Sequence, residues 1–511
     1  MAVRYYDWIA HHARRAPDKL AAVDLATARR FTYGQFEQRV GRLAAHLRNR
    51  MGVAEGERVA VLAPNSTDVF EIQFACARIG AIFVPLNWRL AVPELEFILR
   101  DADPKLLIFD TEFSGPAGDL LRTCSIGQHL ELNGTGAPSS YEQALAQAAG
   151  PYTWAHQTHD DVSTILYTSG TTGLPKGAMV THRMTFYNAM NISPVARITA
   201  RTVCLTVLPL FHTGGLNVYA NPTFHAGGAV VVMRAFDPAE GLQHLTDKQL
   251  GITHFLGVPA NYQFMSALPA FENADFRHLE VCGIGAAPAS LALLEAWAGK
   301  GLPLAQTYGM TETGPILLML DPEDATRKVG SSGPPILHAE LRLVDTEGKA
   351  PAPGEIGEIW VRGPTVTPGY WRRPEATREA FRDGWLRTGD AVRVDEDGYY
   401  TVVDRWKDMY ITGGENVYPA EVENVLYTLP DIAEVAVIGI PDERWGEVGR
   451  AVVVRKPGAK LDEAAVLAHC NGKLARYKMP RSVVFVDALP RNATGKLLKR
   501  ELRDQAAQET G

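Results

Sequence analysis

The order of the apolar runs constrains the fold of this chain more than any other feature. In the N-terminal part a predicted strand at Val59–Ala63 is followed by a predicted helix at Asp68–Ile79. An apolar run at Ala81–Leu86, a helical stretch at Pro93–Arg100 and an extended stretch at Lys105–Asp110 come next. Alternation of strands and helices in this way predicts parallel sheets that are covered by helices.

The pattern changes further along the chain. Runs typical of buried strands recur at 203–208, 229–233, 252–257 and 279–283, and close-spaced strands with polar turns replace them after about Gly330. A compact unit of mixed helices and strands begins near Lys407. We therefore expect an α/β fold with a large N-terminal domain of parallel α/β sheets (1–405), which includes a small β-barrel part (about 330–405), and a small α+β C-terminal domain (406–511). The stretch 115–150 has the composition of a linker.

Composition indicates an ordinary soluble globular protein. A chain of 511 residues is too long for a single hydrophobic core, so two or more domains are expected. The net charge of -7 gives no sign of a nucleic-acid partner. The five cysteines are scattered without a C-x-x-C pair, which favours reduced thiols over a disulfide framework or a zinc site. No segment resembles a signal peptide, a membrane span or a lipidation signal, so we expect a cytoplasmic protein.

A loop rich in glycine and hydroxyl residues follows the apolar run 164–167. The segment Thr168–Gly177 reads Thr-Ser-Gly-Thr-Thr-Gly-Leu-Pro-Lys-Gly. Glycines let backbone N–H groups approach an anion, hydroxyls add donors and Lys176 adds positive charge, so the loop is predicted to bind phosphate. The alternative is a surface loop without a ligand, which would not need the serine, the threonines and the lysine together. The loop is not a Walker A motif, because Gly177 stands where that motif has serine or threonine.

Two other segments group residues that can hold a nucleotide. Tyr308–Glu312, in a predicted polar break, combines an aromatic ring, a hydroxyl and a carboxylate, which can stack on a base, donate to a phosphate and hold Mg²⁺. By itself a glutamate is more often a solvated charge. Asp390 and Arg405 lie on the two sides of a predicted hairpin, where they can both reach a ribose or form an ordinary surface ion pair.

A fourth segment lies near the C-terminus. In Pro490–Lys496 a lysine follows a polar turn that contains glycine. This lysine can contact a ligand, or it can simply be a solvated surface side chain, as most lysines are. The four segments, in this order, resemble those of the adenylate-forming superfamily, which includes acyl-CoA synthetases, peptide-synthetase adenylation domains and luciferases. The resemblance extends from about Asp18 to Arg500.

The resemblance implies an ATP-dependent acid–CoA ligase that uses Mg²⁺. The acid and ATP form acyl-AMP and pyrophosphate, and coenzyme A then converts acyl-AMP to acyl-CoA and AMP. Lys496 matches the lysine that bridges the carboxylate and the α-phosphate, Glu312 the Mg²⁺-associated carboxylate, Thr311 an α-phosphate contact, and His212 a gate beside the acyl pocket. Lys407 matches the hinge between the two domains. The other ATP-binding positions that the resemblance implies are Thr168, Ser169, Gly170, Thr171, Thr172, Gly173, Lys176, Gly285, Ala286, Ala287, Pro288, Tyr308, Asp390 and Arg405.

The resemblance also implies where coenzyme A and the acyl group bind. The positions matched for coenzyme A are Gly413, Gly414, Trp445, Lys478 and Arg481, although Trp445 can instead be a packing residue. The positions matched for the acyl pocket, in addition to His212 and Gly285, are Gly214, Asn217, Gly309, Pro315 and Ile316. Small residues there leave room for a flat ring or an extended chain, and Asn217 can either bond a ring hydroxyl or cap a helix.

The identity of the acid follows less directly. His212-Thr213-Gly214 lacks the carboxylate that amino-acid-activating relatives use for an amino group, which argues against a free amino acid. The chain resembles bacterial feruloyl-CoA synthetases in general texture, so we expect a hydroxycinnamate such as ferulate, with medium- or long-chain fatty acids as the alternative. A luciferase-like oxygenase and a silent adenylate-binding homologue stay open, although intact Lys496, Glu312, Asp390 and Arg405 argue against the silent protein. Small-molecule substrates are the expected partners, and a homodimer is left open.

Overall fold

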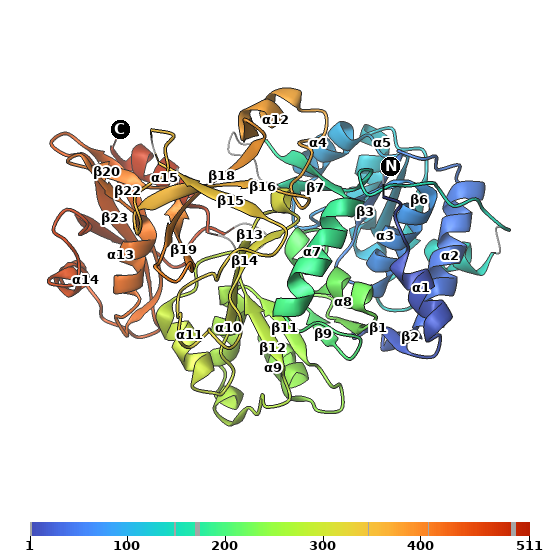
Figure 1. The fold of residues 1–511 in the computed structure, drawn as a ribbon, viewed down its shortest axis with the longest axis horizontal. Helices are drawn as coiled ribbons and strands as arrows, with labels where there is room; N and C mark the ends of the chain where they lie inside the picture. Colours follow the sequence, from blue (N-terminus) through green and yellow to red (C-terminus); the bar gives the residue numbers. More distant parts are fainter. Residues whose placement is uncertain are drawn as a thin grey trace.

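The fold is described by a computed structural model, which covers residues 3–147, 150–168, 174–345, 347–406, 408–491 and 497–510. Figure 1 shows the N-terminal sheets at one end of the long axis and the C-terminal unit at the other. Over the described residues, no helix is both long enough and apolar enough to cross a bilayer. All five cysteines are free, as expected, and all but Cys124 are buried.

The larger of the two N-terminal sheets has eight strands. Its neighbours are parallel except at the two edges, where β13 pairs with β14 and β1 with β2 in antiparallel fashion. The strand order is β14 (Ile316–Met319), β13 (Ala305–Gly309), β12 (Val281–Ile284), β11 (His254–Gly257), β9 (Val203–Thr206), β10 (Ala229–Val232), β1 (Leu20–Asp24) and β2 (Arg29–Thr32).

The second N-terminal sheet has six strands and is parallel except for the pair β7–β8. Its order is β6 (His129–Leu132), β5 (Leu106–Asp110), β3 (Arg58–Leu62), β4 (Ile82–Pro85), β7 (Val162–Thr168) and β8 (Lys176–Thr181). The helices of this half of the chain are α1 (Trp8–Arg15), α2 (Tyr33–Asn49), α3 (Thr67–Ile79), α4 (Val92–Ala102), α5 (Ser114–Thr123), α6 (Ser140–Ala146), α7 (His182–Val195), α8 (Ala220–Ala226), α9 (Pro238–Thr246), α10 (Pro259–Ser266) and α11 (Leu291–Ala298).

Helices stand between the two sheets and on their outer faces. One core cluster joins β3 and β4 of the smaller sheet to β1 and β10 of the larger through α2, α3 and α8. Phe224 of α8 lies at the centre of this layer, with its ring against those of Phe36, Phe70 and Phe74. Helices α9, α10 and α11 cover the outer face of the larger sheet, and α4 and α5 cover that of the smaller one. The result is the helix-covered parallel architecture that the alternating pattern predicts.

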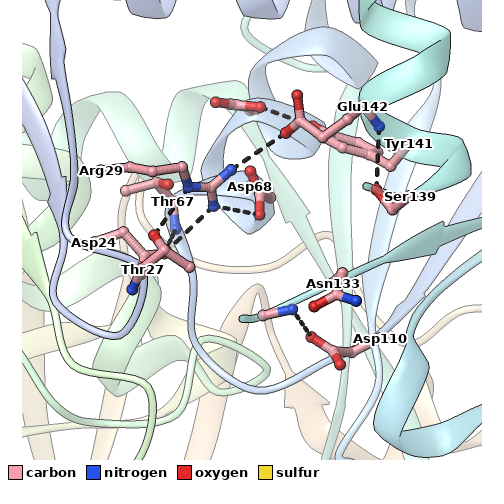
Figure 2. A network of polar contacts seen from close by, with 12 residues as sticks. Asp24, Thr27, Arg29, Thr67, Asp68, Asp110, Asn133, Ser139, Tyr141 and Glu142 are labelled. Carbon is pink, nitrogen blue, oxygen red and sulfur yellow. Dashed lines mark hydrogen bonds and ion pairs between the residues drawn. The ribbon is translucent and has the colours of Figure 1, made fainter. Parts of the chain in front are cut away.

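A buried ion network fastens the edge of this layer (Figure 2). Arg29 of β2 donates to Asp68 of α3 at 2.7 Å and to Glu142 of α6 at 3.2 Å. Asp24 lies 3.6 Å from the same guanidinium. Since these groups come from four separate elements, the network fixes the edge strands relative to the helices.

Antiparallel strands follow the two sheets. A five-stranded sheet contains β15 (Glu340–Val344), β16 (Ile356–Arg362), β17 (Phe381–Arg382), β18 (Trp385–Val394) and β19 (Tyr400–Arg405), with α12 (Pro374–Ala380) beside it. Its side chains share a core with Leu317 and Leu318 of β14, so it packs against the edge of the larger sheet. The C-terminal unit contains β20 (Tyr410–Thr412), β21 (Glu415–Val417), α13 (Pro419–Leu426), β22 (Ile432–Asp442), β23 (Gly446–Arg455), α14 (Glu463–Cys470), β24 (Ser482–Phe485) and α15 (Lys499–Thr510).

Two expectations from the sequence were wrong. The linker-like stretch 115–150 holds most of α5, all of β6 and α6, because Leu120, Leu130 and Tyr141 are buried in the core despite their polar surroundings. Tyr308 is also not in a polar break, since it lies in β13 and pairs with Leu318. The predicted strands and helices before residue 111, and the strand runs at 203–208, 229–233, 252–257 and 279–283, are confirmed to within a few residues. Close-spaced antiparallel strands follow residue 330, as predicted.

Candidate functional site

The predicted site residues converge because of how parallel strands end. Strands β9, β11, β12 and β13 run parallel, so their carboxyl ends meet at one edge of the sheet. His212 follows β9, Gly285 follows β12 and Thr311 follows β13. Ligand sites in open α/β sheets lie at this edge, outside the carboxyl ends of the strands.

The residues that form the predicted nucleoside end of the site lie on three strands. The Tyr308 hydroxyl in β13 donates to Asp390 in β18 at 2.7 Å. Asp390 pairs in register with Arg405 of β19, whose Nε lies 3.7 Å from the carboxylate. Burial, followed by the charge of Asp390, raises the pKa of Tyr308 well above its usual value, so the phenol is a neutral donor. The contact between β13 and the hairpin β18–β19 thus brings Tyr308 next to Asp390 and Arg405, which lie more than 80 residues later in the sequence.

The residues of the predicted phosphate end surround a buried carboxylate. Glu312 lies buried in the short 3-10 helix η4 (Thr311–Thr313) and accepts a 2.8 Å hydrogen bond from the hydroxyl of Tyr370. The Lys176 ammonium at the start of β8 lies 5.5 Å from the centre of the Tyr370 ring. Burial raises the pKa of Glu312, and the bond from Tyr370 opposes that shift. Glu312 and Lys176, which are far apart in the sequence, therefore both contact Tyr370.

Tyr370 was missed by the sequence analysis. Its sequence context, Gly-Tyr-Trp, matches no known ligand-binding motif. Its position becomes clear from the structure, where Tyr370 pairs with Ala178 of β8. Glu312 is fixed further by its own backbone, because its carbonyl accepts a 2.8 Å bond from the N–H of Thr367.

Part of the predicted phosphate loop lies outside the described residues, namely Ser169, Gly170, Thr171, Thr172 and Gly173. Its two ends are described, since Thr168 and Lys176 pair across β7 and β8. Lys496 and the hinge position Lys407 also lie outside the described residues.

The segment Gly285–Pro288 lies where β12 passes into the loop before α11. A methyl group at Gly285 would overlap the hydroxyl of Thr307, so the glycine lets this segment lie close to β13 and the neighbouring Tyr308. Ala286 has φ of 67°, in the left-handed region. Ala287 and Pro288 continue the same turn.

The predicted acyl-pocket residues fall into two groups. Gly214 lies beside His212, whose Nδ1 accepts a 3.1 Å bond from the Gly214 N–H. Gly309 pairs with Ile316 across β13 and β14. A methyl group at Gly309 would overlap the backbone carbonyl of Pro315, so this glycine permits close strand contact and does not by itself open space for a ligand.

Asn217 is buried in the π-helical turn η2 (Gly214–Val218). Its amide donates to Thr213 at 3.3 Å and its carbonyl accepts from Asn221 at 2.8 Å. The side chain thus bonds to residues one helical turn before and after it, and its contact to a ring hydroxyl stays a prediction.

The predicted coenzyme A residues are partly brought together. Gly413 and Gly414 form the turn between β20 and β21 with φ of 60° and 92°, and the Gly413 N–H donates to the Trp445 carbonyl at 2.8 Å. The Arg481 guanidinium lies 5.9 Å from the Trp445 ring centre. Lys478 is not part of this group, because its ammonium forms an ion pair with Glu421 at 2.7 Å.

The family is shown by comparison with known proteins. Residues 9–371 match the model of the AMP-binding enzyme family, and residues 421–496 match the AMP-binding enzyme C-terminal domain. A feruloyl-CoA synthase of an Amycolatopsis species is 42% identical over 97% of this chain and 98% of its own. An indoleacetate–CoA ligase of Aromatoleum aromaticum is 41% identical over 99% of this chain and 98% of its own. The crystal structure of ATP-bound MatB from Rhodopseudomonas palustris superposes with a TM-score of 0.90, at 35% identity over 98% of both chains.

The chain therefore belongs to the AMP-binding enzyme family. Within that family it is an AMP-forming acid–CoA ligase, with the large α/β domain, the antiparallel subdomain and the C-terminal domain that such enzymes have.

Proposed function

We propose that this acid–CoA ligase activates a hydroxycinnamate such as ferulate. The observation that carries the proposal is the 42% identity to a feruloyl-CoA synthase over 97% of this chain. The segment His212-Thr213-Gly214 has no carboxylate that could pair with the amino group of an amino acid. A small cavity beside the turn of His212 also has a lining without an ionised side chain: Cys204, Leu205, Thr206, Val207, Leu208, Gly214, Gly215, Tyr219, Ala220 and Leu256. The similarity to a feruloyl-CoA synthase supports the same class of acid.

The chemistry requires positioning and charge more than a protein nucleophile. The acid's carboxylate attacks the α-phosphorus of ATP, and pyrophosphate leaves. Since both reactants are anions, positive charge must stand where negative charge accumulates in the transition state. We assign that task to Lys496 and Mg²⁺, with Thr311 at the α-phosphate and Thr168–Lys176 around the β- and γ-phosphates.

Glu312 suits a magnesium ion that arrives with ATP. Mg²⁺ in such sites is held by one or two carboxylates, substrate phosphates and water. No group of three or more potential ligand side chains occurs in the described part of the chain, and one buried carboxylate near Lys176 fits this sparse donor set. When bound, the ion would neutralise phosphate charge.

The second half-reaction needs a different arrangement. The thiol of coenzyme A attacks the carbonyl carbon of the acyl-adenylate, and AMP leaves. We propose that rotation of the C-terminal domain about Lys407 withdraws Lys496 and brings the Gly413–Gly414 turn to the site. Trp445, Arg481 and Lys478 would then lie toward coenzyme A, after Lys478 leaves Glu421.

The test is AMP release from ATP, Mg²⁺ and coenzyme A with a panel of acids: ferulate, 4-coumarate, caffeate, benzoate, octanoate, palmitate and several amino acids. We expect CoA-dependent turnover that is fastest with the hydroxycinnamates. Faster turnover of octanoate or palmitate would instead identify a fatty acyl-CoA ligase. Oxygen consumption from the adenylate would indicate a luciferase-like enzyme, and ATP binding without turnover of any acid a silent homologue.

A further inference from the structure

Tyr219 carries a buried hydroxyl whose role no other part of the fold explains. The residue lies between the turn η2 and helix α8, and it is 2% exposed. Within the described residues its hydroxyl has no hydrogen-bond partner. Burying a phenol oxygen without a partner is unfavourable, because it loses its bonds to water and gains none.

The neighbouring strand leaves room for this oxygen. A methyl group at Gly283 of β12 would stand 2.6 Å from the Tyr219 hydroxyl and 2.9 Å from Cδ1 of Leu256. Gly283 and Gly285 lie two residues apart and therefore face the same side of the strand. The hydroxyl thus reaches the sheet about 7 Å along β12 from Gly285, on the face where Gly285 adjoins the site.

The same side chain lines the cavity beside the turn of His212. The cavity has a volume of about 10 Å³, and Leu208, Gly214, Tyr219 and Leu256 contribute to its wall. Two other buried groups near Tyr219 also lack partners among the described residues, the side-chain carbonyl of Asn221 and the hydroxyl of Thr223, but neither residue lines the cavity. Tyr219 differs from them in that it lines this cavity together with Gly214, one of the predicted acyl-pocket residues.

Tyr219 has the right chemistry to recognise a neutral polar group. Burial raises the pKa of its phenol well above the usual value, so the oxygen keeps its proton and can both donate and accept. The remainder of the cavity wall is uncharged and mostly apolar. One neutral donor and acceptor in such a wall suits a hydroxyl or ether oxygen on an otherwise apolar acyl group.

We propose that the Tyr219 hydroxyl hydrogen-bonds a polar substituent at the end of the acyl group farthest from the reacting carboxylate. This makes Tyr219 a specificity-determining residue that favours acids with a hydroxylated ring over the same acids without the hydroxyl. The inference rests on the proposed function, because it places the substrate ring beyond Gly214 and along β12.

The experiment compares Tyr219→Phe with the wild-type enzyme on 4-coumarate and cinnamate, which differ only by the ring hydroxyl. The wild-type enzyme should prefer 4-coumarate in kcat/KM, and the substitution should reduce that preference about tenfold by lowering the value for 4-coumarate alone. The melting temperature of Tyr219→Phe should stay the same or rise, because the substitution removes an unpartnered polar atom.

Tyr262→Phe is the matched control. Tyr262 is also a buried tyrosine beside Gly283, but its hydroxyl already donates to the Gly283 carbonyl at 2.7 Å and it packs in the core on the outer face of the sheet. This variant should lower the melting temperature and leave the ratio of the two acids unchanged. A merely structural role for Tyr219 predicts the same behaviour for both variants.

The outcomes separate the inference from the proposed function. If the wild-type enzyme prefers 4-coumarate and Tyr219→Phe leaves the ratio unaltered, the role of Tyr219 is refuted while the hydroxycinnamate proposal stands. If the wild-type enzyme uses neither cinnamate, the proposed function fails, and the ratio of 8-hydroxyoctanoate to octanoate replaces the aromatic pair. An unchanged ratio there refutes the assignment of Tyr219, and a reduced ratio supports it for a different acid.

Discussion

Among single residues, Glu71 gives the N-terminal domain a distinctive response to pH. The carboxylate is fully buried on α3, where it accepts bonds from Arg39 at 2.5 Å and from Tyr141 at 2.9 Å. Burial raises the pKa of Glu71 to about 7, and the ion pair with Arg39 only partly opposes that shift. The charged and titratable groups around it are Arg39 of α2, Asp68 of α3, Tyr141 and Glu142 of α6, and Arg29 of β2.

A raised folded-state pKa means that the folded protein binds the proton more tightly than the unfolded chain does. The stability contributed by Glu71 is therefore complete below its unfolded pKa and is lost as the pH rises through about 7. Between pH 5 and pH 8, wild-type protein should lose about 2.5 kcal/mol relative to Glu71→Gln, which cannot titrate. Melting temperatures of both proteins at the two pH values measure the difference.

Glu142→Gln is the control for this prediction. Burial opposes ionisation of Glu142, but hydrogen bonds and charge from Arg39 outweigh it and lower the pKa of that carboxyl. Both pKa values of Glu142 then lie below the window, so its substitution should not alter the dependence on pH between 5 and 8. Parallel pH dependence of wild type and Glu71→Gln would contradict the role given to Glu71.

At the scale of elements, the pair β13–β14 sets the position of the nucleoside end. Gly309 lies against the backbone of Pro315 and Ile316, where a methyl group would overlap the Pro315 carbonyl and approach its carbon to 2.8 Å. Gly309→Ala must therefore separate the strands and move the adjacent Tyr308 away from Asp390. We expect a loss of about 1–3 kcal/mol of stability and a raised KM for ATP.

Gly118→Ala shows what the same change does without a clash. Gly118 lies on α5 with no heavy atom within 4 Å of the added methyl group. Alanine in a helix interior is favoured over glycine by about 0.5–1 kcal/mol, so this variant should be neutral or slightly more stable, with an unchanged KM for ATP. If Gly309→Ala behaves like Gly118→Ala, the strand contact does not position Tyr308.

At the scale of the whole molecule, polar contacts join the C-terminal unit to the N-terminal domain. The Asp404 carboxylate accepts from the Ala420 N–H at 3.0 Å and lies 3.6 Å from Lys499, which pairs with Glu423 at 2.9 Å. Gln263 of α10 donates to the Ala433 carbonyl at 3.2 Å. These contacts would have to break if the unit changes orientation between half-reactions, as proposed.

Lys496→Ala tests whether the C-terminal unit serves adenylation separately. Removing the cation should slow acyl-adenylate formation by a factor of about 100 or more, because charge in the transition state loses its partner. Thioester formation from supplied acyl-adenylate and coenzyme A should stay close to the wild-type rate. The two half-reactions are measured separately by pyrophosphate release and by acyl-CoA formation, and equal losses in both would sink the assignment.

Lys407→Pro should produce the opposite result. Proline fixes φ at this position and restricts the preceding residue, so rotation about the hinge is impeded. Adenylation should persist while acyl-CoA formation falls, and full overall turnover in this variant would rule out a hinge at Lys407.

Much of the fold could be predicted because its causes are local. Alternating apolar runs identified strands such as β3 and β11, and the turn Asp395–Gly398 identified the hairpin β18–β19 that pairs Asp390 with Arg405. The stretch 115–150 was misjudged because its few core residues are widely spaced, and only burial against the smaller sheet orders it. Local composition cannot report a contact that is made by distant segments.

The sequence by itself determined the class of enzyme, because four segments (168–177, 308–312, 390–405 and 490–496) occur in the order that the adenylate-forming superfamily has. Tertiary structure alone decided that Tyr370 lies between Glu312 and Lys176, that Gly309 serves strand contact, and that Asn217 bonds along its own helix. It also decided that Tyr219, whose hydroxyl has no partner among the described residues, lines the cavity beside the turn of His212. These facts depend on which segments the sheets bring side by side, and a side chain's partners are set by that arrangement and not by its neighbours in the chain.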